Sequence, residues 1–321
     1  MYCICAKEFW RNETMKTSHI KKKTSTKGGT SPSRIFEKNI PGWLMILPTL
    51  MLFALIIWRP ICIGIGYSFF DLKGFTLNGF VGLDNYKDVL TDTNFIVTLK
   101  NTVMYVFWSL IIGFPLPFIC AIMMNELRHM KGFFKVTTYL PVVIPSIATA
   151  MIWKMIYMGG EGGLLNMILY FFGMAPVDWL GNKSLTIPLI IVAMSWNGFG
   201  STLIVYLASL QSINKDLYEA ASLDGCGIFK KIKYILFPHM RGILLLNFVR
   251  QIIGVFNITE QPLAMTGGGP NGASMSLGLT NYFYAFKYGQ YDRALAVGVI
   301  TFLLLLIWTL VYFVLDKKIN E

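Results

Sequence analysis

Between two long apolar runs of the chain stands the segment Glu219-Ala-Ala-Ser-Leu-Asp-Gly225-Cys-Gly-Ile-Phe-Lys-Lys-Ile-Lys-Tyr-Ile235-Leu-Phe-Pro238. Adjacent membrane spans are normally joined by a short loop, but this polar and basic segment predicts two short helices. Gly225 permits a bend after Asp224, and Pro238 is expected to end the second helix. Over residues 213–238 the chain carries apolar side chains, namely Leu217, Ala220, Ala221, Leu223, Ile228, Phe229, Ile232 and Ile235. These need a partner surface, either elsewhere in this protein or on a docked subunit, so a merely solvated loop is the weaker interpretation.

The composition indicates a polytopic membrane protein. The chain has 321 residues, 55% of them hydrophobic and only 14% charged, with a mean hydropathy of +0.55. An ordinary soluble domain has about 25% charged residues. The net charge of +11 comes largely from basic clusters beside the apolar runs. Such clusters orient a protein in the lipid bilayer, so they give no reason to expect a nucleic acid partner.

Six apolar runs are long enough to cross a bilayer. They lie at roughly 42–69, 96–124, 136–157, 186–210, 242–265 and 294–315. We therefore expect an all-α membrane protein with six transmembrane helices. Four prolines inside these runs predict bends in the second and third helices: Pro115, Pro117, Pro141 and Pro145.

The basic residues predict the orientation. Nineteen lysines and arginines lie on the side that holds both termini and residues 213–241, against six on the other side. Both termini and this segment are therefore expected in the cytoplasm. The expected organisation is a disordered basic tail at 1–39, the first span and an external loop at 40–95, a permease core at 96–316 that includes the coupling segment 213–241, and a short tail at 317–321.

Polar residues recur on one face of the fifth apolar run. They are spaced by three, four, three and four positions: Asn247, Arg250, Gly254, Asn257 and Gln261. Gln251 borders this stripe. A milder stripe in the fourth run consists of Ser195, Gly198, Thr202, Tyr206 and Ser209, with Trp196 and Asn197 adjacent. Polar stripes in membrane helices either line a solute route or join neighbouring helices, and both interpretations remain open.

The chain shows no signature of covalent or nucleotide chemistry. The loop Thr266-Gly-Gly-Gly-Pro-Asn-Gly272 is not followed by the Lys-Ser/Thr of a phosphate-binding loop. The five cysteines and three histidines lack metal-ligand spacing, so we expect no metal site and no catalytic residue. Two alternatives are an ion-coupled secondary transporter and a membrane-embedded enzyme. An ion-coupled secondary transporter would need carboxylates near mid-membrane and an internal repeat in its sequence. A membrane-embedded enzyme would need an acidic or histidine cluster.

Residues Glu219-Ala220-Ala221, Gly225, Ile235 and Pro238 resemble the cytoplasmic "EAA" signature of binding-protein-dependent ABC importer permeases. Every position of that spacing is kept, while Cys226 and Phe237 replace the usual Ala and Leu. Further matches are Phe80-Val-Gly-Leu-Asp-Asn-Tyr86, Asn101-Thr102, Leu140-Pro141, Trp179-Leu-Gly181, Leu210-Gln-Ser-Ile213 and Thr266-Gly-Gly-Gly-Pro270. Over roughly 40–318 the chain resembles the carbohydrate-importer branch, in its maltose-F-like or glycerol-phosphate-A-like half.

The resemblance implies a set of partners in the bacterial cytoplasmic membrane. These are a second, homologous permease in a heterodimer, two ATPase subunits that bind ATP and Mg, an extracytoplasmic solute-binding protein and a carbohydrate substrate. The implied coupling residues are Glu219, Ala220, Ala221, Asp224, Gly225, Ile235 and Pro238. The implied pathway positions are Ser195, Asn197, Gly198 and Ser201 in the fourth span and Gln251, Gly254, Val255 and Ile258 in the fifth. Several positions lack the amides and the tyrosine of the maltose branch, so a maltose-like binding mode is not expected.

Overall fold

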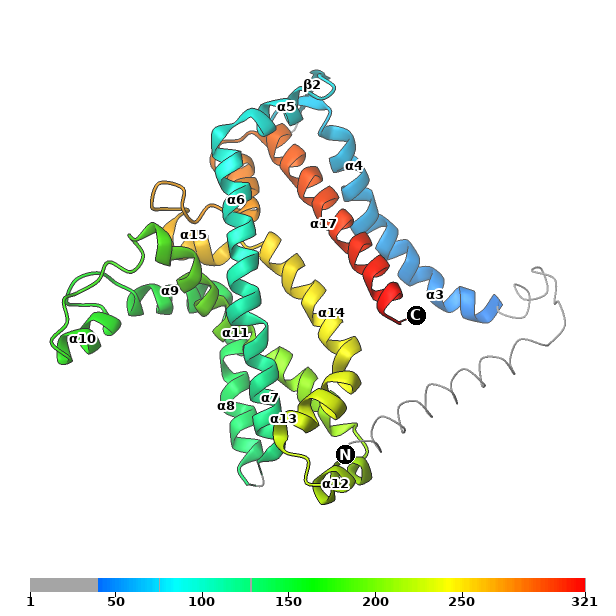
Figure 1. Ribbon diagram of the computed structural model, residues 1–321. Helices are drawn as coiled ribbons and strands as arrows, with labels where there is room; N and C mark the ends of the chain where they lie inside the picture. Colours follow the sequence, from blue (N-terminus) through cyan, green and yellow to red (C-terminus); the bar gives the residue numbers. More distant parts are fainter. Residues whose placement is uncertain (1–39, 75, 128, 321) are drawn as a thin grey trace. The chain divides into compact units, whose positions relative to one another are not determined.

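The computed structural model describes residues 40–320, with the exception of residues 75 and 128. Helices dominate this part of the chain, and one short antiparallel hairpin accompanies them (Figure 1). The predicted disordered tail, residues 1–39, lies outside the described residues. The expectation of an all-helical membrane core is confirmed in its architecture.

Within the described residues, five helices are long and apolar enough to cross a membrane. They are Gly42–Tyr67, Thr93–Glu126, Lys183–Gln211, Ile228–Phe256 and Tyr291–Val314. A sixth candidate is a pair of helices, α8 (Lys131–Val143) and α9 (Ser146–Ile156), which meet at an angle of 98°. The first span consists of α3 (Ile40–Phe53), η1 (Ala54–Trp58) and α4 (Arg59–Tyr67), and the second of α6 (Thr93–Trp108), η2 (Ser109–Gly113) and α7 (Pro115–Glu126). The fourth span is α11 (Lys183–Gln211), and the fifth consists of α13 (Ile228–Lys231), η3 (Ile232–Leu236) and α14 (Phe237–Phe256). The last span is α17 (Tyr291–Asn320).

The prolines act in two different ways. At Pro141 and Pro145 the predicted bend is confirmed, because the third span breaks between α8 and α9. At Pro115 the second span remains one helix, and the π-helical turn η2 directly precedes the proline. A π-helical turn widens the helix locally, which makes room for a proline ring that would otherwise clash with the preceding turn.

The prediction that the second helix of the segment ends at Pro238 is wrong. The helix that begins at Ile228 continues through η3 and α14 to Phe256. A proline inside a helix removes one N–H donor, and its ring clashes with the carbonyl four residues earlier. The π-helical turn η3 lies directly before Phe237 and Pro238, so it accommodates the ring without ending the helix.

The fifth span also differs from its predicted bounds of 242–265. Helix α14 ends at Phe256, and a separate helix, α15 (Glu260–Thr266), follows after a short break. The Asn257 side chain donates to the Ile253 carbonyl (2.8 Å), so it satisfies an acceptor at the end of α14. The polar stripe therefore runs on one helix only from Asn247 to Gly254, and Gln261 belongs to the next helix.

The break in the third span is bonded to the fourth. The Asn197 amide on α11 donates to the Pro141 carbonyl (2.8 Å), the Ile144 carbonyl (3.1 Å) and the Thr149 hydroxyl (3.1 Å). A broken helix leaves carbonyls without helical partners, and no water satisfies them in the hydrocarbon region. Asn197, which the resemblance assigned to the solute pathway, thus holds the broken span together.

The remaining elements connect the spans. They are β1 (Phe70–Lys73), β2 (Thr76–Phe80), α5 (Asp84–Thr91), α10 (Leu164–Phe171), α12 (Lys215–Leu223), α16 (Leu277–Tyr282) and η4 (Phe283–Lys287). The strands pair antiparallel, with Phe70 opposite Phe80. After α10 the chain folds around Asn166, whose amide oxygen accepts from the Val177 N–H (3.0 Å) and the Trp179 indole N–H (2.9 Å). The matched Trp179 therefore has a structural partner.

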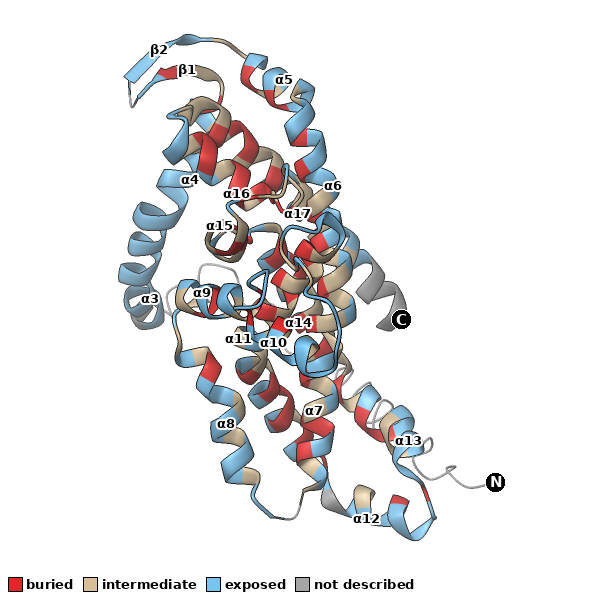
Figure 2. Cartoon of the chain, turned by 90° about the vertical axis from the view of Figure 1, so that its left-hand side faces the viewer, coloured by how far each residue is buried: buried red, intermediate tan, exposed pale blue. Residues whose placement is uncertain are grey.

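The described residues divide into two compact units. One comprises residues 65–212 and 242 onward, and the other comprises the chain up to Gly64 together with Ile213–Arg241. The unit of residues 65–212 and 242 onward contains two apolar core clusters, one around Tyr105, Ile190 and Val255 and another around Val89, Leu277 and Val297. Helix α3 is coloured as exposed in Figure 2, and its exposed side chains include Trp43, Leu44 and Met45. Lipid or a partner subunit must therefore cover that helix.

Replacing Asn197 with leucine should destabilise the protein by roughly 1–3 kcal/mol. The Ile144 carbonyl would lose its donor, and the Pro141 carbonyl would keep only the Ile144 N–H (3.2 Å). Thermal unfolding of the purified complex would report the loss. Ser201→Ala on the same helix is the matched control, since the Ser201 hydroxyl donates only to the Gly198 carbonyl of its own helix. Equal melting temperatures for the two variants would contradict the role of Asn197.

Candidate functional site

A polar cavity of about 100 Å³ lies among the second, fourth and fifth spans. It is lined by Gly113, Phe114, Thr202, Tyr206, Asn247, Arg250 and Gln251. Each of the three spans contributes, so the helices fix the positions of these side chains. A cavity lined by amides, hydroxyls and a guanidinium inside membrane spans is a candidate functional site.

Gly113 makes this arrangement possible. A Cβ atom at this position would lie 2.7 Å from the Ser195 hydroxyl oxygen and 3.0 Å from the Gln251 amide nitrogen. No side chain larger than hydrogen fits without displacing these two groups. Gly113 also closes the π-helical turn η2, and such turns often occur at functional sites.

The polar groups around the cavity are not all satisfied within the subunit. The Tyr206 and Ser195 hydroxyls are buried, and neither has a hydrogen-bond partner among the described residues. Asn247 is largely buried and donates to the Ile243 carbonyl (2.9 Å). Among the described residues, the one ion pair joins Arg293 to Asp88, so Arg250 has no acidic partner there. The cavity therefore offers donors to a group that is not part of the subunit.

The structure brings together some of the predicted pathway residues. Ser195, Arg250 and Gln251 meet at or beside the cavity, joined by Thr202, Tyr206 and Asn247 from the two stripes. Gly113 and Phe114 were not predicted, and the one available signal was a glycine within an apolar run shortly before two prolines.

Other predicted pathway residues lie elsewhere. Val255 and Ile258 are buried in an apolar core cluster, so they face the protein interior and not a solute route. Gly198 and Gly254 have open space where a Cβ would lie. Trp196 is partly exposed, and its ring meets that of Trp153 edge-on at 6.0 Å.

The coupling segment, residues 213–241, forms the predicted helix-bend-helix. The Asn214 side chain caps α12 by accepting from the Asp216 N–H (2.9 Å). Gly225 follows the helix with φ = 70°, a conformation that favours glycine. Lys231 donates to the Ser222 hydroxyl (2.9 Å) and lies 4.7 Å from the centre of the Tyr218 ring, so it ties α13 to α12.

The coupling segment presents large apolar side chains to its surroundings. Leu223 is 90% exposed and Phe229 is 85% exposed. Glu219 and Ala220 are also exposed, whereas Ala221 and Ile235 are buried. A bonded, capped segment with apolar side chains on its surface is suited to docking.

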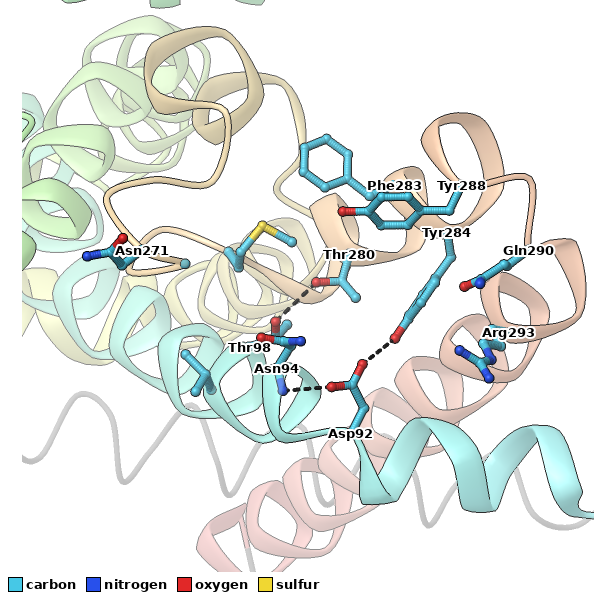
Figure 3. Close-up of a pocket in the computed structure, with 13 residues that line it drawn as sticks. Asp92, Asn94, Thr98, Asn271, Thr280, Phe283, Tyr284, Tyr288, Gln290 and Arg293 are labelled. Carbon is cyan, nitrogen blue, oxygen red and sulfur yellow. Dashed lines mark hydrogen bonds between the residues drawn. The ribbon is translucent and has the colours of Figure 1, made fainter.

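A larger pocket, of about 660 Å³, lies where α6 and α17 begin (Figure 3). Here the Tyr284 hydroxyl donates to the Asp92 carboxylate (2.9 Å), and burial together with this carboxylate raises the pKa of Tyr284 to about 12. The hydroxyls of Thr98 and Thr280, which are 182 positions apart in the sequence, form a hydrogen bond at the pocket. No pattern in the sequence pointed to this pocket, because its residues come from distant segments.

The glycine-rich motif after α15 has a structural explanation. The Asn101 amide donates to the carbonyls of Gly272 (2.7 Å) and Met275 (3.1 Å), and the Tyr105 hydroxyl donates to the Ser274 carbonyl (2.9 Å). The second span thus binds the backbone of this loop. The matched motifs Asn101-Thr102 and Thr266-Gly-Gly-Gly-Pro270 belong to one packing arrangement.

These features define the class: a multi-pass helical membrane protein with a polar cavity among its spans and a helix-bend-helix segment between two of them. Residues 113–321 match the family described as the binding-protein-dependent transport system inner membrane component. The chain belongs to this family of ABC transporter permeases. It is accordingly a plasma-membrane protein and not an enzyme.

Several relatives are similar over most of their length. The trehalose/maltose transport system permease protein MalF of Thermococcus litoralis is 32% identical over 84% of this chain and 92% of that protein. The arabinooligosaccharides transport system permease protein AraP of Bacillus subtilis is 31% identical over 72% of this chain and 74% of that protein. A solved bacterial ABC transporter involved in import of the acidic polysaccharide alginate has the same fold. It has a TM-score of 0.77 at 24% identity and covers 90% of this chain and 99% of that one.

Gly113→Val should narrow the polar cavity and destabilise the protein by about 1–3 kcal/mol through overpacking against Ser195 and Gln251. Solute uptake and the melting temperature of the assembled complex should both fall. Gly242→Val in α14 is the matched control, since nothing lies within 4 Å of a Cβ there. Indistinguishable behaviour of the two variants would show that Gly113 is not a packing constraint.

Proposed function

We propose that this chain forms one half of the translocation pathway of an ATP-driven carbohydrate importer. Family membership supplies the transport class, and relatives that carry trehalose, maltose and arabino-oligosaccharides support the substrate class. The observation that carries the coupling role is the 213–241 segment, with its capped helices and its exposed Leu223 and Phe229.

The remaining partners follow from the same proposal. Two ATPase subunits would bind ATP and Mg and would receive the coupling segment in the cytoplasm, where both termini would also lie. A second, homologous permease would complete a heterodimer and cover apolar surface such as that of the first span. A binding protein would deliver the solute from outside. One solved relative is an alginate transporter in complex with a periplasmic protein that carries an alginate pentasaccharide.

The polar cavity supports the pathway role. Sugars present many hydroxyl groups, and each one removed from water without a replacement hydrogen bond costs about 1–3 kcal/mol. Arg250, Gln251 and Thr202 supply such bonds within the spans. ATP-driven closure of the ATPase pair would move the coupling segment and change access to this route.

Gly225→Val should uncouple transport from ATP hydrolysis, because a β-branched residue at φ = 70° is strained by roughly 1–2 kcal/mol. We expect ATP-driven uptake in proteoliposomes to fall about tenfold, which corresponds to that energy, while the spans remain folded.

Gly227→Val is the matched control for this substitution. Gly227 lies in the same segment with open space around it, but its φ of −65° suits any residue. Uptake by a well-expressed Gly225→Val complex equal to that of Gly227→Val would refute the coupling role.

The purified chain alone should neither bind nor hydrolyse ATP, whereas the complex with its ATPase subunits should do both. The reason is the lack of a phosphate-binding loop in the sequence. Hydrolysis of radiolabelled ATP is the measurement, with the assembled complex as the positive control. Turnover by the chain free of other subunits would overturn the expectation.

A further inference from the structure

We propose that the polar cavity binds a carboxylate of the transported solute, so that the substrate is an acidic saccharide such as an oligouronate. The inference rests on the proposed carbohydrate transport. It concerns Arg250 and its neighbours, and it assigns a chemical class to the solute.

Arg250 carries a positive charge that no acidic side chain among the described residues balances. Its guanidinium is permanently protonated and lies on a candidate span, Ile228–Phe256. Charged side chains inside membrane spans normally pair with an opposite charge or line a polar route. Within the described part of the chain, Arg250 has neither an acidic partner nor a hydrogen bond. Arg250 is exposed on this subunit, so a compensating group can reach it from outside.

The side chains around Arg250 in the cavity include neutral groups that can donate hydrogen bonds. The Tyr206 hydroxyl is fully buried at the cavity and has no partner in the described structure. Gln251 and Thr202 add an amide and a hydroxyl. A carboxylate only accepts hydrogen bonds, and it has two oxygens with about four acceptor sites. It therefore matches a guanidinium beside neutral donors better than a neutral sugar hydroxyl does.

The cavity also has room for a carboxylate. Its volume of about 100 Å³ accommodates this group, which has only three heavy atoms. The carboxylate would enter the cavity and meet the Arg250 guanidinium there.

The test uses the assembled transporter in nanodiscs, without binding protein, titrated calorimetrically with trigalacturonate, maltotriose or inorganic phosphate. We expect trigalacturonate to bind more tightly than the other two. Arg250→Gln should weaken trigalacturonate binding at least tenfold. Arg250→Lys should weaken it less, because bidentate hydrogen bonding is lost but the positive charge is kept. Tyr206→Phe should weaken it several-fold.

Lys154→Gln is the matched control. It removes one positive charge from the membrane region, but Lys154 donates to the Ala264 carbonyl and does not line the cavity. Trigalacturonate binding should be unchanged in this variant. Size-exclusion chromatography confirms that each variant complex is assembled.

Three outcomes would overturn the inference. One is equal trigalacturonate affinity in the wild-type complex and Arg250→Gln. Another is phosphate binding as tight as trigalacturonate binding, which would indicate a small-anion site. The third combines two results: the wild-type complex does not bind trigalacturonate, and the permease pair dissociates in Arg250→Gln. This combination would indicate that Arg250 pairs with a carboxylate on the partner permease. ATP-driven uptake of maltotriose with any of these results would leave the proposed function intact, whereas absence of all saccharide uptake would refute that function.

Discussion

The structure depends on one constraint: in the hydrocarbon region, every backbone polar group must find its partner within the protein. Regular helices meet this requirement by themselves, but this chain interrupts several of its spans. The break between α8 and α9 leaves carbonyls at Pro141 and Ile144, and both accept from the Asn197 amide. The break after α14 leaves the Ile258 carbonyl, which accepts from the Ser276 hydroxyl. Polar side chains in the spans are thus required first by the backbone.

The same constraint separates structural polar groups from functional ones. Asn197 and Asn257 both bond to carbonyls of broken helices, although Asn197 lies beside one stripe that suggested a solute route and Asn257 lies in the other. At the polar cavity the situation is different, because the hydroxyls of Ser195 and Tyr206 have no partner within the described subunit. Buried donors without partners are costly unless another molecule satisfies them. Among the described residues, the cavity is therefore one of the places where the fold leaves hydrogen bonding incomplete, together with Arg241 and Trp308.

Much of the architecture could be predicted from the sequence, because length and apolarity decide whether a run crosses a membrane. The coupling segment was also predictable, since Asn214 and Gly225 have local conformational preferences that act at the ends of helices. The length of the polar stripe could not be predicted. Spacing by three and four places residues on one helical face only while the helix continues, and nothing in Phe256-Asn-Ile-Thr259 indicates that the helix breaks there. After the break, residues no longer share the face of the preceding helix. The end assigned to Pro238 was wrong for a related reason: a π-helical turn lets a proline lie inside a helix.

Helix continuity also links the coupling segment to the cavity. One helix, Ile228–Phe256, carries the exposed Phe229 near its beginning and Asn247, Arg250 and Gln251 toward its end. A force applied to the first turn of a continuous helix displaces the residues further along it, because its backbone hydrogen bonds resist compression. The π-helical turn η3 lies between these two regions, and such turns are frequent at functional sites. Pro238, shortly after this turn, is thus accommodated within a continuous helix and does not end it.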